Sequence, residues 1–116
     1  MAIKTILTEP NKILRQVSKQ VEKVGEEEKK IMDDMLETMY EAPGIGLAAV
    51  QVGIPLRLVV IDVSWNKEDG NKDPKFLINP KIVSKSEKLS SYEEGCLSIP
   101  GQYAEIERPE SCVVEY

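Results

Sequence analysis

The sequence contains no histidine at all. A Cys–His nucleophile needs an imidazole as its base, and it is therefore excluded within this chain. A metal held by this chain alone would need Cys96 together with carboxylates, for which Asp62, Glu93 and Glu94 are candidates by residue type only. One thiolate with nearby carboxylates is a poor match to a three-ligand catalytic zinc site.

Long apolar runs and an excess of positive charge are also missing. No apolar run approaches the roughly 20 residues that a membrane-spanning helix needs, so we expect no membrane partner. The formal net charge is −5, from 15 Lys and Arg against 20 Asp and Glu. Phosphate binding needs a basic face, so this balance argues against nucleic acid as a partner. The first ten residues, MAIKTILTEP, carry no signal-peptide pattern, and a cytoplasmic location is therefore expected.

Cysteine is scarce, with only Cys96 and Cys112 present. Because nothing indicates secretion, we expect free thiols rather than a disulfide. Cys112 lies in the apolar run SCVVEY and is predicted to be a buried small hydrophobic residue. Cys96 lies between Gly and Leu after two glutamates, which is a less ordinary setting.

Helical patterns occupy the first part of the chain. Glu26–Glu41 has apolar residues in i, i+4 rows and three glutamates in its first turn, and Pro43 with Gly44 ends the pattern. Pro10–Ser18 has a shorter apolar spacing that also predicts a helix.

Strand-like runs follow. Leu56–Val63 is nearly all apolar and rich in β-branched residues, which predicts a central strand. Shorter strands are predicted at Phe76–Ile78, Lys81–Ser84, Leu89–Glu93, Tyr103–Glu107 and Val113–Tyr116. The connections are too short for βαβ crossovers, so the sequence predicts one α+β domain over residues 1–116, with N-terminal helices packed on a mainly antiparallel sheet.

The run GIGLAAVQ at Gly44–Gln51 combines glycines with small and apolar residues. Gly44 and Gly46 allow positive φ angles and a close approach of the backbone to a ligand. Gln51 adds an amide donor, and such a donor in a dry cleft stabilises a developing oxyanion by about 3 kcal/mol. Taken alone, the run is explained better by a helix end followed by a short buried strand.

The run EGCLS at Glu94–Ser98 is the second candidate. A cysteine thiolate is a soft ligand for zinc or ferrous iron. The backbone N–H of Leu97 lies one residue further on, where it could face the same reacting carbonyl. A strand end with an incidental cysteine is an equally good interpretation of this run alone.

In this order and at this separation, the two runs resemble the first two signature motifs of peptide deformylase. That family consists of metal hydrolases that remove the formyl group from the N-terminal methionine of new bacterial proteins. Every motif position matches, and the flanking segments ILRQVS, MLETMY, VVIDVS, LINPKI and SIPGQYAEIERP are similar as well. The resemblance covers nearly the whole chain.

The resemblance implies a role for each of several residues. Cys96 would be the thiolate ligand of the metal, which is Fe²⁺ or Zn²⁺ in the family. Gln51 and the N–H of Leu97 would polarise the formyl oxygen as catalytic donors. Tyr103 stands where relatives often carry an arginine near the substrate, so the chain departs from the family's pattern there.

The resemblance also implies a substrate groove. Ile45, Gly46 and Gly95 would line it, and an N-formyl-methionyl peptide would pair there as an extra strand. Glu94 would be a buried structural carboxylate paired with Arg108.

The family takes two metal ligands and its general base from a third motif, HExxH, on a helix near its C-terminus. No such motif occurs among these 116 residues. The sequence also stops at Tyr116 inside a strand-like run, so we expect a truncated deformylase domain that lacks the C-terminal metal-binding helix. Such a chain would bind metal weakly or not at all and would be inactive by itself.

Two functional interpretations remain open. The first is a deformylase fragment. The second is a non-catalytic shortened homologue that binds peptide or associates with itself. In either case, removal of the helix would uncover an apolar sheet face and leave Val113–Tyr116 with an open edge, which predicts a homodimer that covers this face.

Overall fold

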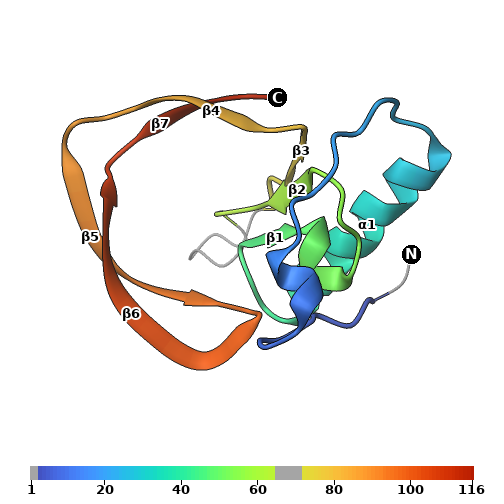
Figure 1. The fold of residues 1–116 in the computed structure, drawn as a ribbon, viewed down its shortest axis with the longest axis horizontal. Coiled ribbons are helices and arrows are strands. Elements are labelled where there is room, and N and C mark those ends of the chain that lie inside the picture. The colour runs from blue at the N-terminus through green and yellow to red at the C-terminus, as the bar shows by residue number, and fades with distance from the viewer. Residues whose placement is uncertain (1–2, 65–71) are drawn as a thin grey trace.

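The computed structural model describes residues 3–64 and 72–116 (Figure 1). One α-helix comes first and antiparallel strand pairs follow, which confirms the predicted α+β class. The elements in order are η1 (Lys12–Arg15), α1 (Glu26–Glu41), β1 (Gly46–Ala48), η2 (Ala49–Val52), β2 (Leu58–Ile61), β3 (Lys75–Ile78), β4 (Lys81–Lys85), β5 (Leu89–Cys96), β6 (Ile99–Pro109) and β7 (Cys112–Glu115).

Helix α1 has the predicted bounds. At its start, the N–H of Gly25 donates to Oε1 of Glu28 at 3.0 Å, while at its end the N–H of Gly44 donates to the carbonyl of Met39 at 2.7 Å. Its buried face carries Met35 and Met39, which are fully buried in the core. The methionines predicted as apolar rows therefore pack the helix onto the sheet.

The predicted helix at Pro10–Ser18 is reduced to a single 3₁₀ turn, η1. The side chain of Asn11 accepts from the N–H of Ile13, and Gln16 already has an extended backbone with ψ of 143°. No residue of η1 is buried, so no packing stabilises a longer helix.

The sheet next to α1 has the order β1-β2-β3, with β2 in the centre. Gly46 lies opposite Ile61, and Leu58 lies opposite Ile78. Leu58 and Val60 of β2 are fully buried and belong to the same cluster as the helix methionines. The sequence therefore predicted the central strand correctly, although β2 is shorter than Leu56–Val63.

The remaining strands form two separate ribbons, β4–β7 and β5–β6. Figure 1 shows the β4–β7 ribbon leading away from the three-stranded sheet and the β5–β6 ribbon curving back toward the N-terminal half of the chain. Most of their residues are exposed, because within residues 3–64 and 72–116 no second layer covers them. The prediction that Cys112 is buried is wrong for this reason: it lies on β7 and is exposed.

Among the described residues, none of the helices has the length and apolar character required to cross a membrane.

Candidate active-site pocket

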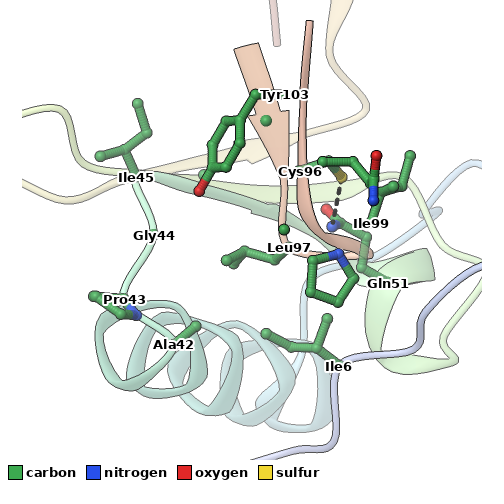
Figure 2. A pocket seen from close by; sticks show the side chains of 15 residues that line it. Ile6, Ala42, Pro43, Gly44, Ile45, Gln51, Cys96, Leu97, Ile99 and Tyr103 are labelled. Atoms are coloured by element: carbon green, nitrogen blue, oxygen red, sulfur yellow. Dashed lines mark hydrogen bonds between the residues drawn. The ribbon is translucent and has the colours of Figure 1, made fainter.

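A cavity of about 820 Å³ lies between the helix–sheet unit and the β5–β6 ribbon (Figure 2). One wall comes from the segment that leaves α1 and from η2, and the other comes from the end of β5 and the turn into β6. All six site residues named from the sequence line this cavity: Ile45, Gly46, Gln51, Gly95, Cys96 and Leu97. Residues that are 45 positions apart in the chain thus meet in one place.

Both the oxygen and the nitrogen of the Gln51 side-chain amide make hydrogen bonds. Oε1 accepts a hydrogen bond from the N–H of Ala48 at 3.0 Å. Nε2 donates to Oγ of Ser98 at 3.1 Å and lies 3.7 Å from Sγ of Cys96. η2 ends one residue further on, at Val52, because Gly53 adopts a left-handed conformation with φ of 85°. The short helix therefore presents Gln51 to the pocket in one orientation.

Cys96 ends strand β5 at an irregularity of the ribbon. Gly95 lies opposite Tyr103, whereas Cys96 lies opposite Ile99, so the register shifts between the two neighbouring residues. Such shifts are common next to active sites, where they re-aim a side chain. The thiol is free, as predicted, and in Figure 2 it points toward Gln51.

Leu97 fixes the turn that follows. Its side chain packs against the core cluster and lies so close to Gly44 that a Cβ there would be 2.7 Å from Cδ1. A side chain at position 44 would therefore force Leu97 to move, so glycine is favoured there by the close approach. Gly44 and Gly46 do not use the positive φ angles that glycine allows; among the described glycines, Gly53 and Gly101 do.

The ring of Tyr103 covers Gly95 at the rim of the pocket. A Cβ at Gly95 would lie 2.7 Å from Cε1 of that ring. The aromatic ring of Tyr103 therefore forms part of the pocket wall (Figure 2).

Glu94 and Arg108 form the ion pair expected from the sequence. Nε and Nη2 of Arg108 donate to the two carboxylate oxygens at 2.5 and 2.8 Å. The hydrogen bonds from Arg108 hold the pKa of Glu94 below its ordinary value, and the carboxylate in turn raises the pKa of Arg108. Glu94 is half-buried and not buried as the resemblance implied, and the pair ties β5 to β6 two residues before Cys96.

Asp62 is engaged in the core and does not line the pocket. Its carboxylate accepts from the hydroxyl of Tyr40 at 2.5 Å, from the N–H and Oγ of Ser64, and from the N–H of Asp73. Burial raises the pKa of Asp62, but these hydrogen bonds outweigh it and hold the pKa well below its ordinary value. Asp62 is therefore a structural carboxylate and not a ligand at the cavity.

The donor set does not fit a complete metal site. Nowhere in residues 3–64 and 72–116 do three or more His, Cys, Asp or Glu side chains group so that they could hold an ion. Cys96 offers one sulfur at the pocket, whereas a catalytic zinc site needs three protein ligands.

Sequence reasoning missed one residue of the site. Ser98 is the last letter of EGCLS, and no chemistry was assigned to it, yet its hydroxyl is the partner of Gln51. Its position two residues after the cysteine was a signal, but a contact across 47 residues cannot be read from spacing along the chain.

Comparison with known proteins supports the resemblance that the two motifs indicated. The family model described as polypeptide deformylase matches residues 3–116. A peptide deformylase of Pelagibacter ubique is 60% identical over 116 residues, and one of Rhizobium meliloti is 56% identical over the same length. Both matches cover all of this chain, and the chain spans 66% of the length of each relative.

Solved structures of peptide deformylases superpose closely on the fold of this chain. Peptide deformylase from Ehrlichia chaffeensis, in complex with actinonin, superposes with a TM-score of 0.92 at 43% identity and covers all of this chain and 69% of that one. The enzyme from Thermotoga maritima gives 0.91 at 40% identity, covering all of this chain and 74% of that one.

Proposed function

This chain belongs to the peptide deformylase family, and we propose that its 116 residues supply the peptide groove, the oxyanion donors and one metal ligand of a deformylase site. Residues 1–116 would then form one domain that is incomplete with respect to catalysis. The reaction is the removal of the formyl group from N-formyl-methionyl peptides. Because such peptides come from new protein chains, the proposed place of action is the cytoplasm.

One observation carries this proposal most directly, namely the meeting of Gln51 and Cys96 in the pocket. Nε2 of Gln51 lies 3.7 Å from Sγ of Cys96, so a carbonyl held beside the sulfur is within reach of the amide. A donor fixed in place before the reaction stabilises an oxyanion without reorganisation. In this proposal Gln51 and the N–H of Leu97 polarise the formyl oxygen.

The strand edges at the pocket support the proposed peptide groove. β1 is an edge strand, paired only with β2, and β5 is paired only with β6 among the described strands. Ile45 and Gly46 at β1 and Gly95 on β5 line the cavity between these edges. An extended peptide adds to such edges through main-chain hydrogen bonds, and the absence of a side chain at Gly46 leaves room for its backbone.

A metal would complete the chemistry in the family, where Fe²⁺ or Zn²⁺ activates water for attack on the formyl carbon. The residues described here supply only Cys96 toward it, so no catalytic step is assigned to this chain alone. We propose that metal binding by the isolated chain is weak or absent.

The test is formate release from a formyl-methionyl peptide with added iron or nickel. We expect the isolated chain to give no appreciable turnover, because it contains neither a histidine ligand nor the family's general base. Turnover at the level of a complete deformylase, abolished by Cys96→Ala, would overturn the proposal that the chain is catalytically incomplete.

A second candidate, self-association without catalysis, is favoured by the two ribbons. Ile82 and Val113 of β4–β7 are 54% and 57% exposed, and Tyr92 of β5 is 74% exposed. Apolar side chains exposed on strand ribbons can be covered by a partner, and a second copy of the chain offers the same strand edges. Light scattering at micromolar concentration should give twice the 13.0 kDa monomer mass. A monomer that unfolds cooperatively would contradict this candidate.

A further inference from the structure

The amide of Gln51 has a defined orientation because its two ends meet different partners. The N–H of Ala48 donates to Oε1, and Nε2 donates to Oγ of Ser98. Turning the amide by 180° would set its NH₂ group against the N–H of Ala48, donor against donor. The side chain is thereby restricted to the state in which Nε2 faces Cys96.

Ser98 is suited to hold that state because it is itself immobilised. It is 5% exposed, and its backbone carbonyl accepts from the N–H of Glu9 at 2.9 Å. The carbonyl of Gln51 accepts from the N–H of Leu7 at 2.7 Å. One short segment of the chain therefore fixes the backbones of both residues, and the hydroxyl is a stationary acceptor.

We propose that Ser98 is a positioning residue that takes one hydrogen of the Gln51 Nε2 group and so directs the other hydrogen into the pocket beside Cys96. The inference rests on the proposed function for the role of Gln51 as oxyanion donor. Ser98 does not touch the reacting carbonyl. It acts by keeping the donor aimed before the substrate arrives, which is the condition for electrostatic stabilisation without reorganisation.

A purely structural role would give a different result. If Ser98 served only through its burial and its backbone bond to Glu9, loss of the hydroxyl would lower stability without a specific effect on the Gln51 amide. The side-chain amide signals of Gln51 in a ¹⁵N-labelled sample separate the two cases, with Gln51→Ala used to assign them.

The experiment compares four samples: wild type, Ser98→Ala, Ser98→Thr and Ser91→Ala. In Ser98→Ala we expect the Nε2 hydrogens to exchange with water up to about tenfold faster, which corresponds to the loss of one hydrogen bond. Their two proton shifts should also move toward those of the exposed Gln16. Ser98→Thr keeps the hydroxyl and should restore both values. Ser91→Ala removes an exposed serine from the preceding strand, β5, and should leave them unchanged.

Unchanged Gln51 signals in folded Ser98→Ala, or an equal change in Ser91→Ala, would overturn the proposal. If Ser98→Ala does not fold, Ser98→Cys replaces the oxygen by a weaker acceptor of similar shape and should move the same signals. Unchanged signals in that variant would also overturn it. The readout needs no turnover, so a failed formate assay and a failed positioning role give separate results.

Discussion

The hydroxyl of Tyr40 donates a 2.5 Å hydrogen bond to Oδ2 of Asp62, and this bond joins the last turn of α1 to the end of β2. Asp62 is 1% exposed. Burial, followed by the hydrogen bond to this carboxylate, raises the pKa of Tyr40 to about 12. The phenol therefore stays protonated and remains a donor throughout the neutral range.

Replacing Tyr40 by Phe should lower the free energy of unfolding by on the order of 1 to 3 kcal/mol, because it removes a donor from a carboxylate in the core. Urea denaturation followed by circular dichroism measures the change. Tyr92→Phe is the matched control, since Tyr92 is exposed on β5, and it should change stability by less than about 0.5 kcal/mol. Equal effects of the two substitutions would contradict the assigned role of the Tyr40 hydroxyl.

Lowering the pH should destabilise the fold because two carboxylates become protonated. The pKa values of Asp62 and Glu94 are both held below their ordinary values in the folded chain. Groups of this kind contribute stability that is present above the unfolded-state pKa, near 4, and is lost as the pH falls through the folded-state pKa. We therefore expect the urea midpoint to be constant between pH 7 and pH 5 and to fall below about pH 4.

Arg108→Gln separates the two carboxylates. It removes the hydrogen bonds that lower the pKa of Glu94 and leaves Asp62 as it is. The variant should lose less stability than wild type between pH 5 and pH 3. A pH profile that runs parallel to wild type would show that the Glu94–Arg108 pair contributes nothing to the acid dependence.

Gly95→Ala should displace the ring of Tyr103 from the rim of the pocket. The new Cβ would lie 2.7 Å from Cε1 and 2.9 Å from Cδ1 of that ring, so the ring must move. Tyr103 is exposed, and the cost should be small, below about 1 kcal/mol. In a double-mutant cycle, Tyr103→Ala should remove that cost.

Gly101→Ala gives the contrasting case. No atom lies within 4 Å of a Cβ there, but φ is 76°, so the cost comes from backbone strain and should persist in Tyr103→Ala. Additive effects of Gly95→Ala and Tyr103→Ala would contradict the close contact between the two residues.

The sequence predicted those parts of the fold that depend on local pattern. The bounds of α1 follow from its apolar rows and from the glycine and proline after it, and β2 follows from its β-branched run. Pro10–Ser18 has a helical spacing too, but no buried face supports it, and only η1 forms. Cys112 lies in an apolar run, yet its burial depends on a covering layer, which no local pattern reports.

The site was predicted from motifs, and its internal contacts were not. The two motifs placed Gln51 and Cys96 together through resemblance to a family, and the structure brings their side chains to 3.7 Å. The contact of Ser98 with Gln51 joins residues 47 positions apart, and it depends on the register shift after Gly95. Such geometry follows from the folded ribbon and has no signature in the spacing of residues.

In the function proposed above, Gln51 and Cys96 are the oxyanion donor and the sulfur ligand of a deformylase site. The most direct measurement joins this chain to the part of the Pelagibacter ubique relative that lies outside the 66% spanned by this chain, and follows formate release. We expect the chimaera to turn over substrate. Gln51→Ala should lower kcat by about 10² to 10³, and Cys96→Ala should abolish turnover. Ser91→Ala should leave turnover unchanged. A folded, active chimaera whose turnover survives both Gln51→Ala and Cys96→Ala would contradict the proposed function.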